Sequence, residues 1–406
     1  MKINCYKISF QVYILYALLP VLHSISGYIQ IAIIMTAFAF LLLSMLSNID
    51  SISTMQTFVL LLLSFLFAYM IYMGEYTVTI FEQQYGLAKF LMLLLFWFPM
   101  YMLPGLSKGI TETKEDIFNL ILVLCCITSI TTLIGIFRFE EPCRALAKGT
   151  SALTDYYQSL NIGGYGFVYA LILLIPALLH KYKITKRKIY IGIILLFTIC
   201  IIGASYGTAF VVFAIVMGVY LYLQIKCNVV IKTIITFIIG IMVFSYDSWK
   251  QIVKWIYLIL EKIGVESLSS RMEMVYRSLT IDSQVMHLEE RVALREMSLD
   301  VFNKNPFLGN LELNNKQALG MHSEICDMLG GTGIIGVLLF FILIAAIAYF
   351  LKRQIVSRDM RNIYISILAG MIFLIYYNTI ITSIEILLII CCVIFSEEKN
   401  NGEKRI

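Results

Sequence analysis

Long, uninterrupted apolar runs dominate this sequence and limit what it can fold into. They are roughly 17–20 residues long, the length that a helix needs to cross the apolar core of a bilayer. Because the bilayer interior has no water to satisfy backbone N–H and C=O groups, such runs must be helical. The alternating ten-residue segments of a membrane β-barrel are absent. Only 14% of the residues are charged, against about 25% in soluble domains. The sequence therefore predicts an all-α polytopic membrane protein.

Twelve candidate spans follow from these runs, and they divide the chain into three parts. Nine spans with short loops occupy residues 1–245, a polar segment occupies 246–330, and three spans with a tail occupy 331–406. The first run lacks a small-residue cleavage site and is predicted to be retained as a span. The candidate spans are 8–26, 29–47, 55–73, 87–103, 117–137, 162–179, 189–205, 207–225, 229–245, 331–350, 361–377 and 380–395.

Loop charges predict the orientation of these spans. The loop 180–188 carries five Lys or Arg and no acid, and the loop 351–361 carries four basic residues and one acid. Short loops rich in Lys and Arg stay in the cytoplasm. With twelve spans both loops, and both termini, fall on the cytoplasmic side. The segment 246–330, with nine basic and twelve acidic residues, and the shorter loop 138–161 then lie outside.

Charge and cysteine content exclude some classes of function. The net charge of +5 is dispersed over short loops and forms no basic domain, so nothing indicates nucleic acid as a partner. The nine cysteines show no paired spacing of a zinc site or a disulfide framework. Cys143 and Cys326 both fall in loops, and the sequence leaves open whether they pair. No paired acidic motif predicts a metal site, and no cofactor is expected.

The external segment contains a predicted amphipathic helix at 287–303. Its apolar face is predicted from helical spacing to hold Leu288, Val292, Leu299 and Phe302. Arg291 and Arg295 lean toward that face one turn apart. Neither arginine has a carboxylate three or four residues away along the helix. Like charges at this spacing repel, so the pair is expected to bind an anion from elsewhere. A tertiary salt bridge, lipid headgroups or ligand phosphates would each serve.

A polar passage follows the helix and leads into the tenth span. Pro306 is expected to end the helix, and Gly309 to allow a turn. His322 or Ser323 stands at the predicted start of the next helix, where N–H groups favour anions. Four glycines there are best explained by close helix packing, and they are Gly330, Gly331, Gly333 and Gly336. The imidazole of His322 can accept a proton near neutral pH; a hydrogen-bonded structural histidine is the alternative.

The ordered set of Arg291, the turn "NPFLGN" and His322 beside a Gly-rich span resembles the O-antigen ligase and polymerase superfamily, whose members include Wzy-type polysaccharide polymerases. Members carry an arginine, then a turn with Pro and Gly, then a histidine at the end of the external loop. This chain departs from the pattern: Arg295 stands where Trp is common, Asn310 replaces a frequent glycine, and "HSE" replaces "HN".

The resemblance implies a GT-C-like membrane fold with one large extracytoplasmic loop in the bacterial cytoplasmic (inner) membrane. It implies polymerisation of polysaccharide repeat units (O-antigen or capsule) from an undecaprenyl-diphosphate-linked oligosaccharide. This glycosyltransferase would need neither nucleotide nor metal. A flippase and a chain-length regulator are expected partners, besides the lipid bilayer.

Site residues are expected accordingly. The donor diphosphate would be bound by three arginines, namely Arg291, Arg295 and Arg271, with Arg291 stabilising the charge of the leaving group. His322 would take the proton from the acceptor hydroxyl, with Glu324 as a rival or a helper. Two arginines of the other external loop would hold the acceptor, and they are Arg138 and Arg144.

Three other functions remain as alternatives. A ligase of the same superfamily would move finished polymer to another acceptor. A flippase for lipid-linked sugars would be expected to carry charges within its spans and to have short loops on both sides, which this sequence does not show. A membrane scaffold or sensor would not need a buried arginine pair.

Overall fold

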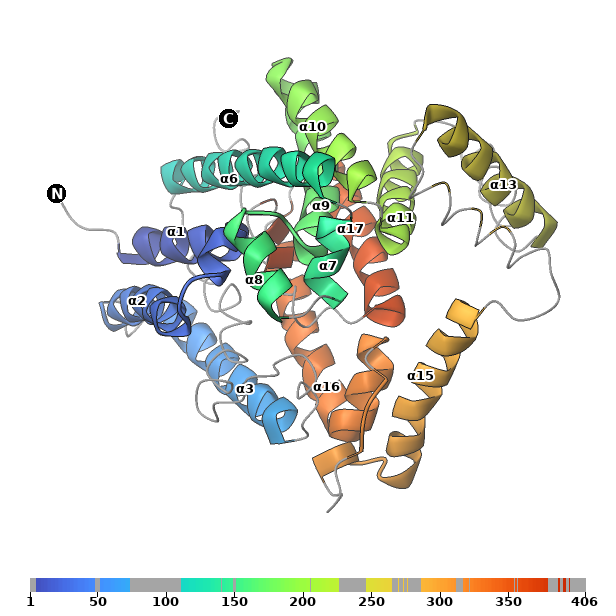
Figure 1. Ribbon diagram of the computed structural model, residues 1–406. Coiled ribbons are helices and arrows are strands. Elements are labelled where there is room, and N and C mark those ends of the chain that lie inside the picture. The colour runs from blue at the N-terminus through green and yellow to red at the C-terminus, as the bar shows by residue number, and fades with distance from the viewer. Residues whose placement is uncertain are drawn as a thin grey trace.

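The structure is a computed structural model, and it describes most of the chain. Elements are named as in Figure 1. The described ranges are 5–47, 52–73, 111–139, 141–148, 151–204, 206–225, 246–264, 286–311, 317–320, 322–353 and 357–378, with single residues between and after them.

Within these ranges all regular structure is helical (Figure 1). The elements are α1 (Cys5–Leu18), η1 (Pro20–His23), α2 (Gly27–Leu46), α3 (Ile52–Met73), α6 (Thr111–Arg138), α7 (Pro142–Lys148), α8 (Ser151–Ser159), α9 (Tyr165–Thr185), α10 (Ile189–Gly203), α11 (Gly207–Gln224), α13 (Tyr246–Ile263), α15 (Met286–Lys304), η2 (Gly309–Leu311), α16 (Glu324–Lys352) and α17 (Arg358–Tyr377).

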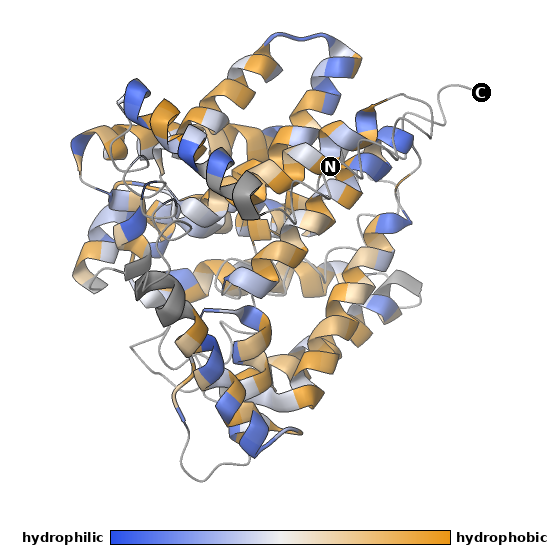
Figure 2. Ribbon diagram, turned by 90° about the vertical axis from the view of Figure 1, so that its right-hand side faces the viewer, coloured by the Kyte–Doolittle hydropathy of each residue, from blue (hydrophilic) through white to orange (hydrophobic). Residues whose placement is uncertain are grey.

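Six of the described helices are long and apolar enough to cross a membrane, namely α2, α6, α9, α11, α16 and α17. Two shorter apolar stretches, Met55–Ile71 and Ile189–Gly203, match further predicted spans. Figure 2 shows hydrophobic residues along most of the helices and hydrophilic residues near many helix ends. The all-α membrane class is therefore confirmed. The predicted spans 87–103 and 229–245, and most of 380–395, lie outside the described residues.

Two predicted span boundaries are wrong for local reasons. The span 8–26 is not one helix: α1 ends at Leu18, and Pro20 starts the 3-10 turn η1, because proline lacks an N–H and disfavours helix in the residue before it. The span 331–350 begins earlier, at Glu324, because Ser323 caps α16 there. The helix start itself was predicted at His322 or Ser323, and only the apolar span was placed seven residues later.

Helix α9 forms the centre of the bundle. Every residue from Gly166 to Leu178 is buried, as expected for a helix that is apolar on all sides. It contacts α10, α11 and α17. Peripheral helices expose large apolar side chains instead, such as Leu43 of α2 and Leu62 of α3, which is the arrangement that lipid contact requires.

Antiparallel packing of α9 and α17 gives the bundle two chemically different ends. At one end Lys183 Nζ lies 2.7 Å from Asp359 Oδ2. At the other end the side-chain amide of Asn378 donates to Tyr169 Oη at 2.9 Å. Since a helix rises about 1.5 Å per residue, these ends are about 21 Å apart along α9. The two basic loops, 180–188 and 351–361, therefore lie at the same end, as predicted.

Candidate functional site

The turn after α15 fits tightly against α16. Helix α15 ends at Lys304, and Gly309 in the following turn has φ +59°, so the predicted helix and its stop are confirmed. A Cβ on Gly309 would lie 2.3 Å from the carbonyl oxygen of Gly330. The backbone N–H of Ile334 donates to Pro306 O at 2.9 Å. Gly330 and Gly333 of α16 thus serve the close backbone approach that the sequence predicted.

Helix α16 is broken by Gly333, which makes that approach possible. Gly333 has φ 64° and ψ −167° inside an otherwise helical run, a conformation that only glycine adopts readily. A Cβ there would lie 2.3 Å from Phe307 O. The kink also frees the N–H of Ile334 from the helix, so that it can bond to the turn.

The inward face of α15 differs from the predicted one. Val292, expected to face inward, is 47% exposed, whereas Ser298 and Val301 are buried. The side chain of Leu288 lies outside the described ones. Ser298 turns inward because its hydroxyl donates to Asp327 Oδ1 of α16 at 2.6 Å. The rotation of α15 about its own axis is therefore set by this buried polar contact with α16 and not by the spacing of its apolar residues.

Asp327 ties three segments together in the interior. Its second carboxylate oxygen accepts from the N–H of Ser323 at 3.0 Å. The hydroxyl of Ser298 in turn accepts from the N–H of Gly320 at 2.9 Å. Asp327 is completely buried, and a buried carboxylate needs such donors to compensate for its lost hydration. Helix α15, the segment 317–320 and the start of α16 are thus fixed around one carboxylate.

His322 lies between the two residues that this network holds. Gly320 is on one side and Ser323 on the other, while His322 itself is exposed. Ser323 caps α16 by accepting from the N–H of Cys326, which confirms the predicted helix start. The imidazole is therefore presented at the surface from an anchored backbone.

Glu324 lies beside His322 but in a different environment. Glu324 is completely buried, and its backbone N–H donates to the carbonyl of Asn378 at 3.1 Å. Glu324 and Asp327 both belong to the first turn of α16. Two carboxylates there compensate the positive end of the helix.

Arg295 reaches the same region from α15. Its guanidinium carbon lies 5.8 Å from the ring centroid of Tyr376 and 5.7 Å from that of Tyr377. These tyrosines end α17, directly before Asn378, which bonds the first residue of α16. Cation–π contacts use the face of a guanidinium and leave its edge geometry suited to bidentate anion binding. Arg295 and the His322–Glu324 segment are thus brought to one end of the bundle.

The other arginines predicted for the site differ in what the structure describes of them. The backbone of Arg291 is helical one turn before Arg295, and its side chain lies outside the described ones. Arg271 also lies outside the described residues. Arg138 is exposed at the end of α6. Arg144 pairs with Glu141 at 3.1 Å in the loop 138–161.

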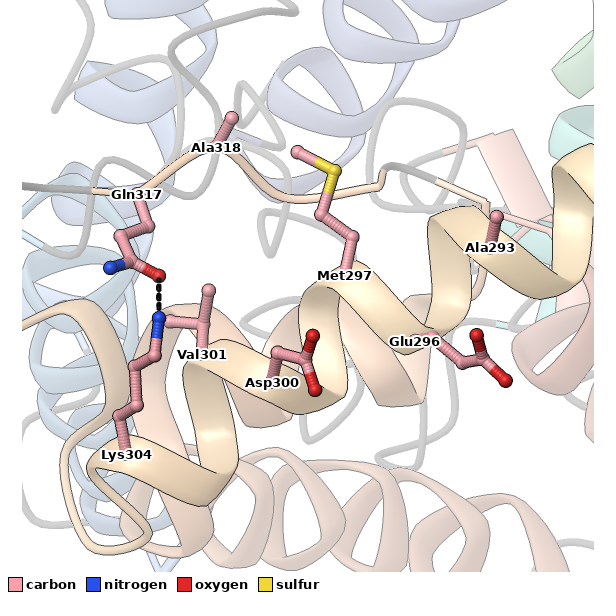
Figure 3. A pocket seen from close by; sticks show the side chains of 8 residues that line it. All are labelled: Ala293, Glu296, Met297, Asp300, Val301, Lys304, Gln317 and Ala318. Atoms are coloured by element: carbon pink, nitrogen blue, oxygen red, sulfur yellow. Dashed lines mark hydrogen bonds between the residues drawn. The ribbon is translucent and has the colours of Figure 1, made fainter.

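An open groove of about 400 Å³ lies along another face of α15 (Figure 3). Its lining includes the carboxylates of Glu296 and Asp300, and Lys304 Nζ donates to Gln317 Oε1 at 3.0 Å. Arg295 is not among its lining residues. Two acids at one groove disfavour a diphosphate and suit an uncharged, hydroxyl-rich ligand better.

Cysteine chemistry and a clustered metal site find no support in the described residues. Cys143 and Cys326 are both free thiols, so the pairing left open by the sequence is absent. Burial raises the pKa of the Cys143 thiol, which makes it a poor nucleophile. In the part of the chain that the structure describes, no three His, Cys, Asp or Glu side chains could share a metal ion.

Several residues of this site escaped the sequence-based prediction. Tyr376 and Tyr377 could have been found as aromatic residues at the end of a span, where membrane interfaces favour them. Asp327 and Ser298 meet across 29 positions, and no local pattern shows such a contact. Comparisons with protein families, curated proteins and solved structures found no match to this chain.

Proposed function

We propose that this chain is a Wzy-type polysaccharide polymerase that extends glycans on undecaprenyl diphosphate at the outer face of the bacterial cytoplasmic membrane. One observation carries the proposal. Arg295, His322 and the two tyrosines of α17 gather at the end of the bundle opposite the basic loops. If those loops are cytoplasmic, this gathering lies outside the cell, where the lipid-linked donor is found.

The proposed reaction transfers the growing glycan from its lipid diphosphate to the next repeat unit. An acceptor hydroxyl oxygen attacks the anomeric carbon of the donor sugar, and a new glycosidic C–O bond forms. The bond between that carbon and the diphosphate oxygen breaks, and undecaprenyl diphosphate leaves with the bonding electrons. Arg295 and Arg291, with Arg271, stabilise the charge that develops on the leaving group.

His322 takes the hydroxyl proton in this proposal. It is exposed while its backbone is anchored, so it can meet a substrate without losing its position. Glu324 is fully buried and does not reach a substrate in this conformation. We therefore assign Glu324 a positioning role beside His322 and not the role of the base.

The finer features of the fold belong to the same proposal. Twelve spans in a GT-C-like arrangement would place both termini in the cytoplasm and the segment 246–330 outside. A flippase would supply the lipid-linked units, and a chain-length regulator would limit the product. Arg138, exposed at the end of α6, and Arg144 would contribute to acceptor binding.

Purified protein in vesicles, supplied with lipid-linked repeat units, tests the proposal directly. The unchanged protein should produce a ladder of longer lipid-linked glycans, resolved by electrophoresis. His322→Ala and Arg291→Ala should each reduce chain growth by at least about 100-fold, the usual range for one general base or charge-stabilising group. Single repeat units should remain on the lipid.

Arg187→Ala is the matched control, because Arg187 is an exposed arginine of the basic loop at the opposite end. It should leave chain growth unchanged. Wild-type polymer lengths in both site variants would refute the assigned roles. Accumulation of long lipid-linked polymer after gene deletion would instead indicate the ligase of the same superfamily.

A further inference from the structure

Helix α13 has an apolar side and a charged side that differ sharply. Trp255, Ile256, Ile259 and Leu260 recur at helical spacing along one side. The first three are 67%, 41% and 51% exposed. Lys254 and the acidic and basic residues of the last turn, Glu261 and Lys262, are also exposed. A contiguous exposed apolar strip of this kind marks a surface that contacts a membrane or a partner.

The charges of α13 prevent it from crossing the bilayer. Its 18 residues include Asp247, Lys250, Lys254, Glu261 and Lys262, and α13 is not among the helices apolar enough to span. The exposed side chains of Lys254, Glu261 and Lys262 lie on one side of the helix, and Leu258 is the apolar residue among them. Apolar and cationic sides with tryptophan are typical of helices that lie in a membrane interface.

The position of α13 in the chain puts it at that interface. The sequence predicts a span at 229–245, and α13 begins at the next residue, Tyr246. A helix that starts where a span ends starts at the bilayer surface. In Figure 1 it lies at the right-hand edge of the molecule, outside the helical bundle. On its charged side Lys254 Nζ lies 6.0 Å from the ring centroid of Tyr276, so this residue of the external segment approaches that side.

We propose that α13 lies flat at the external surface of the cytoplasmic membrane, in the interface between lipid and water. Trp255, Ile256 and Ile259 are immersed among the lipids, and Lys254 faces the external segment. The partner is the lipid surface itself. Such helices insert about 5–10 Å into the boundary between headgroups and acyl chains. Helix α13 would thereby hold the segment 246–330, which carries Arg295 and His322, against the membrane. This proposal does not depend on the proposed glycosyl transfer.

Tryptophan fluorescence of the full chain in vesicles of phosphatidylethanolamine and phosphatidylglycerol tests the proposal. The three tryptophans of the chain are first replaced by Phe, and one is then introduced by Ile256→Trp or by Lys254→Trp. These positions are about 200° apart around the helix, so the two proteins are matched probes of opposite sides. Quenching is measured with acrylamide in the water and with lipids brominated near either end of the acyl chain.

The Ile256→Trp protein should be quenched by lipids brominated near the glycerol end and protected from acrylamide. The Lys254→Trp protein should show the reverse. Equal acrylamide quenching of both proteins would overturn the proposal, because α13 would then lie in water. Strongest quenching of both proteins by lipids brominated near the methyl end would also overturn it, because α13 would then span the bilayer. Neither readout depends on enzymatic activity, so its failure is distinguishable from failure of the proposed reaction.

Discussion

Asp327 is the single residue on which the geometry around His322 depends most. Its carboxylate accepts from the buried hydroxyl of Ser298 and from the N–H of Ser323. Asp327→Ala should leave both donors unsatisfied, and each costs about 1–3 kcal/mol. Thermal unfolding of the purified protein in one detergent should show a clearly lower midpoint.

Asp300→Ala is the matched control, since Asp300 is an exposed carboxylate of α15 and such changes usually stay within about 0.5 kcal/mol. Ser298→Ala combined with Asp327→Ala should cost less than the sum of the single changes, because the two residues share one hydrogen bond. Strict additivity would contradict the coupling.

Single positions at the site were predictable where the signal was local. Ser323 precedes an apolar run and caps α16, and Pro306 with Gly309 ends α15, as the sequence indicated. The contact between Ser298 and Asp327 was not predictable, because it joins distant parts of the chain and a serine on a helix carries no directional signal. This contact also explains why the predicted apolar face of α15 was wrong at Val292.

At the scale of elements, the joint between the turn after α15 and the kink of α16 is fixed by glycine. Gly309→Ala would add a Cβ 2.3 Å from Gly330 O at φ +59°. Gly264→Ala is the matched comparison: Gly264 also has a positive φ, +81°, and its Cβ would meet nothing within 4 Å. Both changes carry a left-handed cost of about 1–2 kcal/mol.

Gly309→Ala should then cost about 1–3 kcal/mol more than Gly264→Ala, because the backbone of α16 must move. Thermal midpoints of the two purified variants in the same detergent measure this difference. Equal midpoints would mean that the turn and α16 separate without cost, which is incompatible with the close approach described.

At the scale of the whole molecule, charge alone predicted that both basic loops share one end. The contact between Lys183 and Asp359 confirms it, and Lys7 of α1 pairs with Asp116, while Lys181 lies over Phe118 of the same helix α6. The start of α1 is therefore at this end too. At the opposite end the side-chain amide of Asn161, a buried loop residue, donates to Thr128. A hydropathy pattern cannot predict that a polar loop residue such as this one is buried.

The orientation of the molecule in the membrane can be tested with two cysteine substitutions at opposite ends. Phe307→Cys places a thiol at a residue that is 67% exposed in the turn before α16. Thr185→Cys places one at an exposed position in the basic loop. Because Lys- and Arg-rich loops stay in the cytoplasm, a membrane-impermeant maleimide should label Phe307→Cys in intact cells. It should label Thr185→Cys only after the membrane is opened.

The unchanged protein gives the background of the native cysteines, of which Cys125, Cys143 and Cys200 are buried. The opposite labelling pattern would place the site in the cytoplasm, where it could not meet an externally presented donor, and would refute the polymerase proposal together with the orientation.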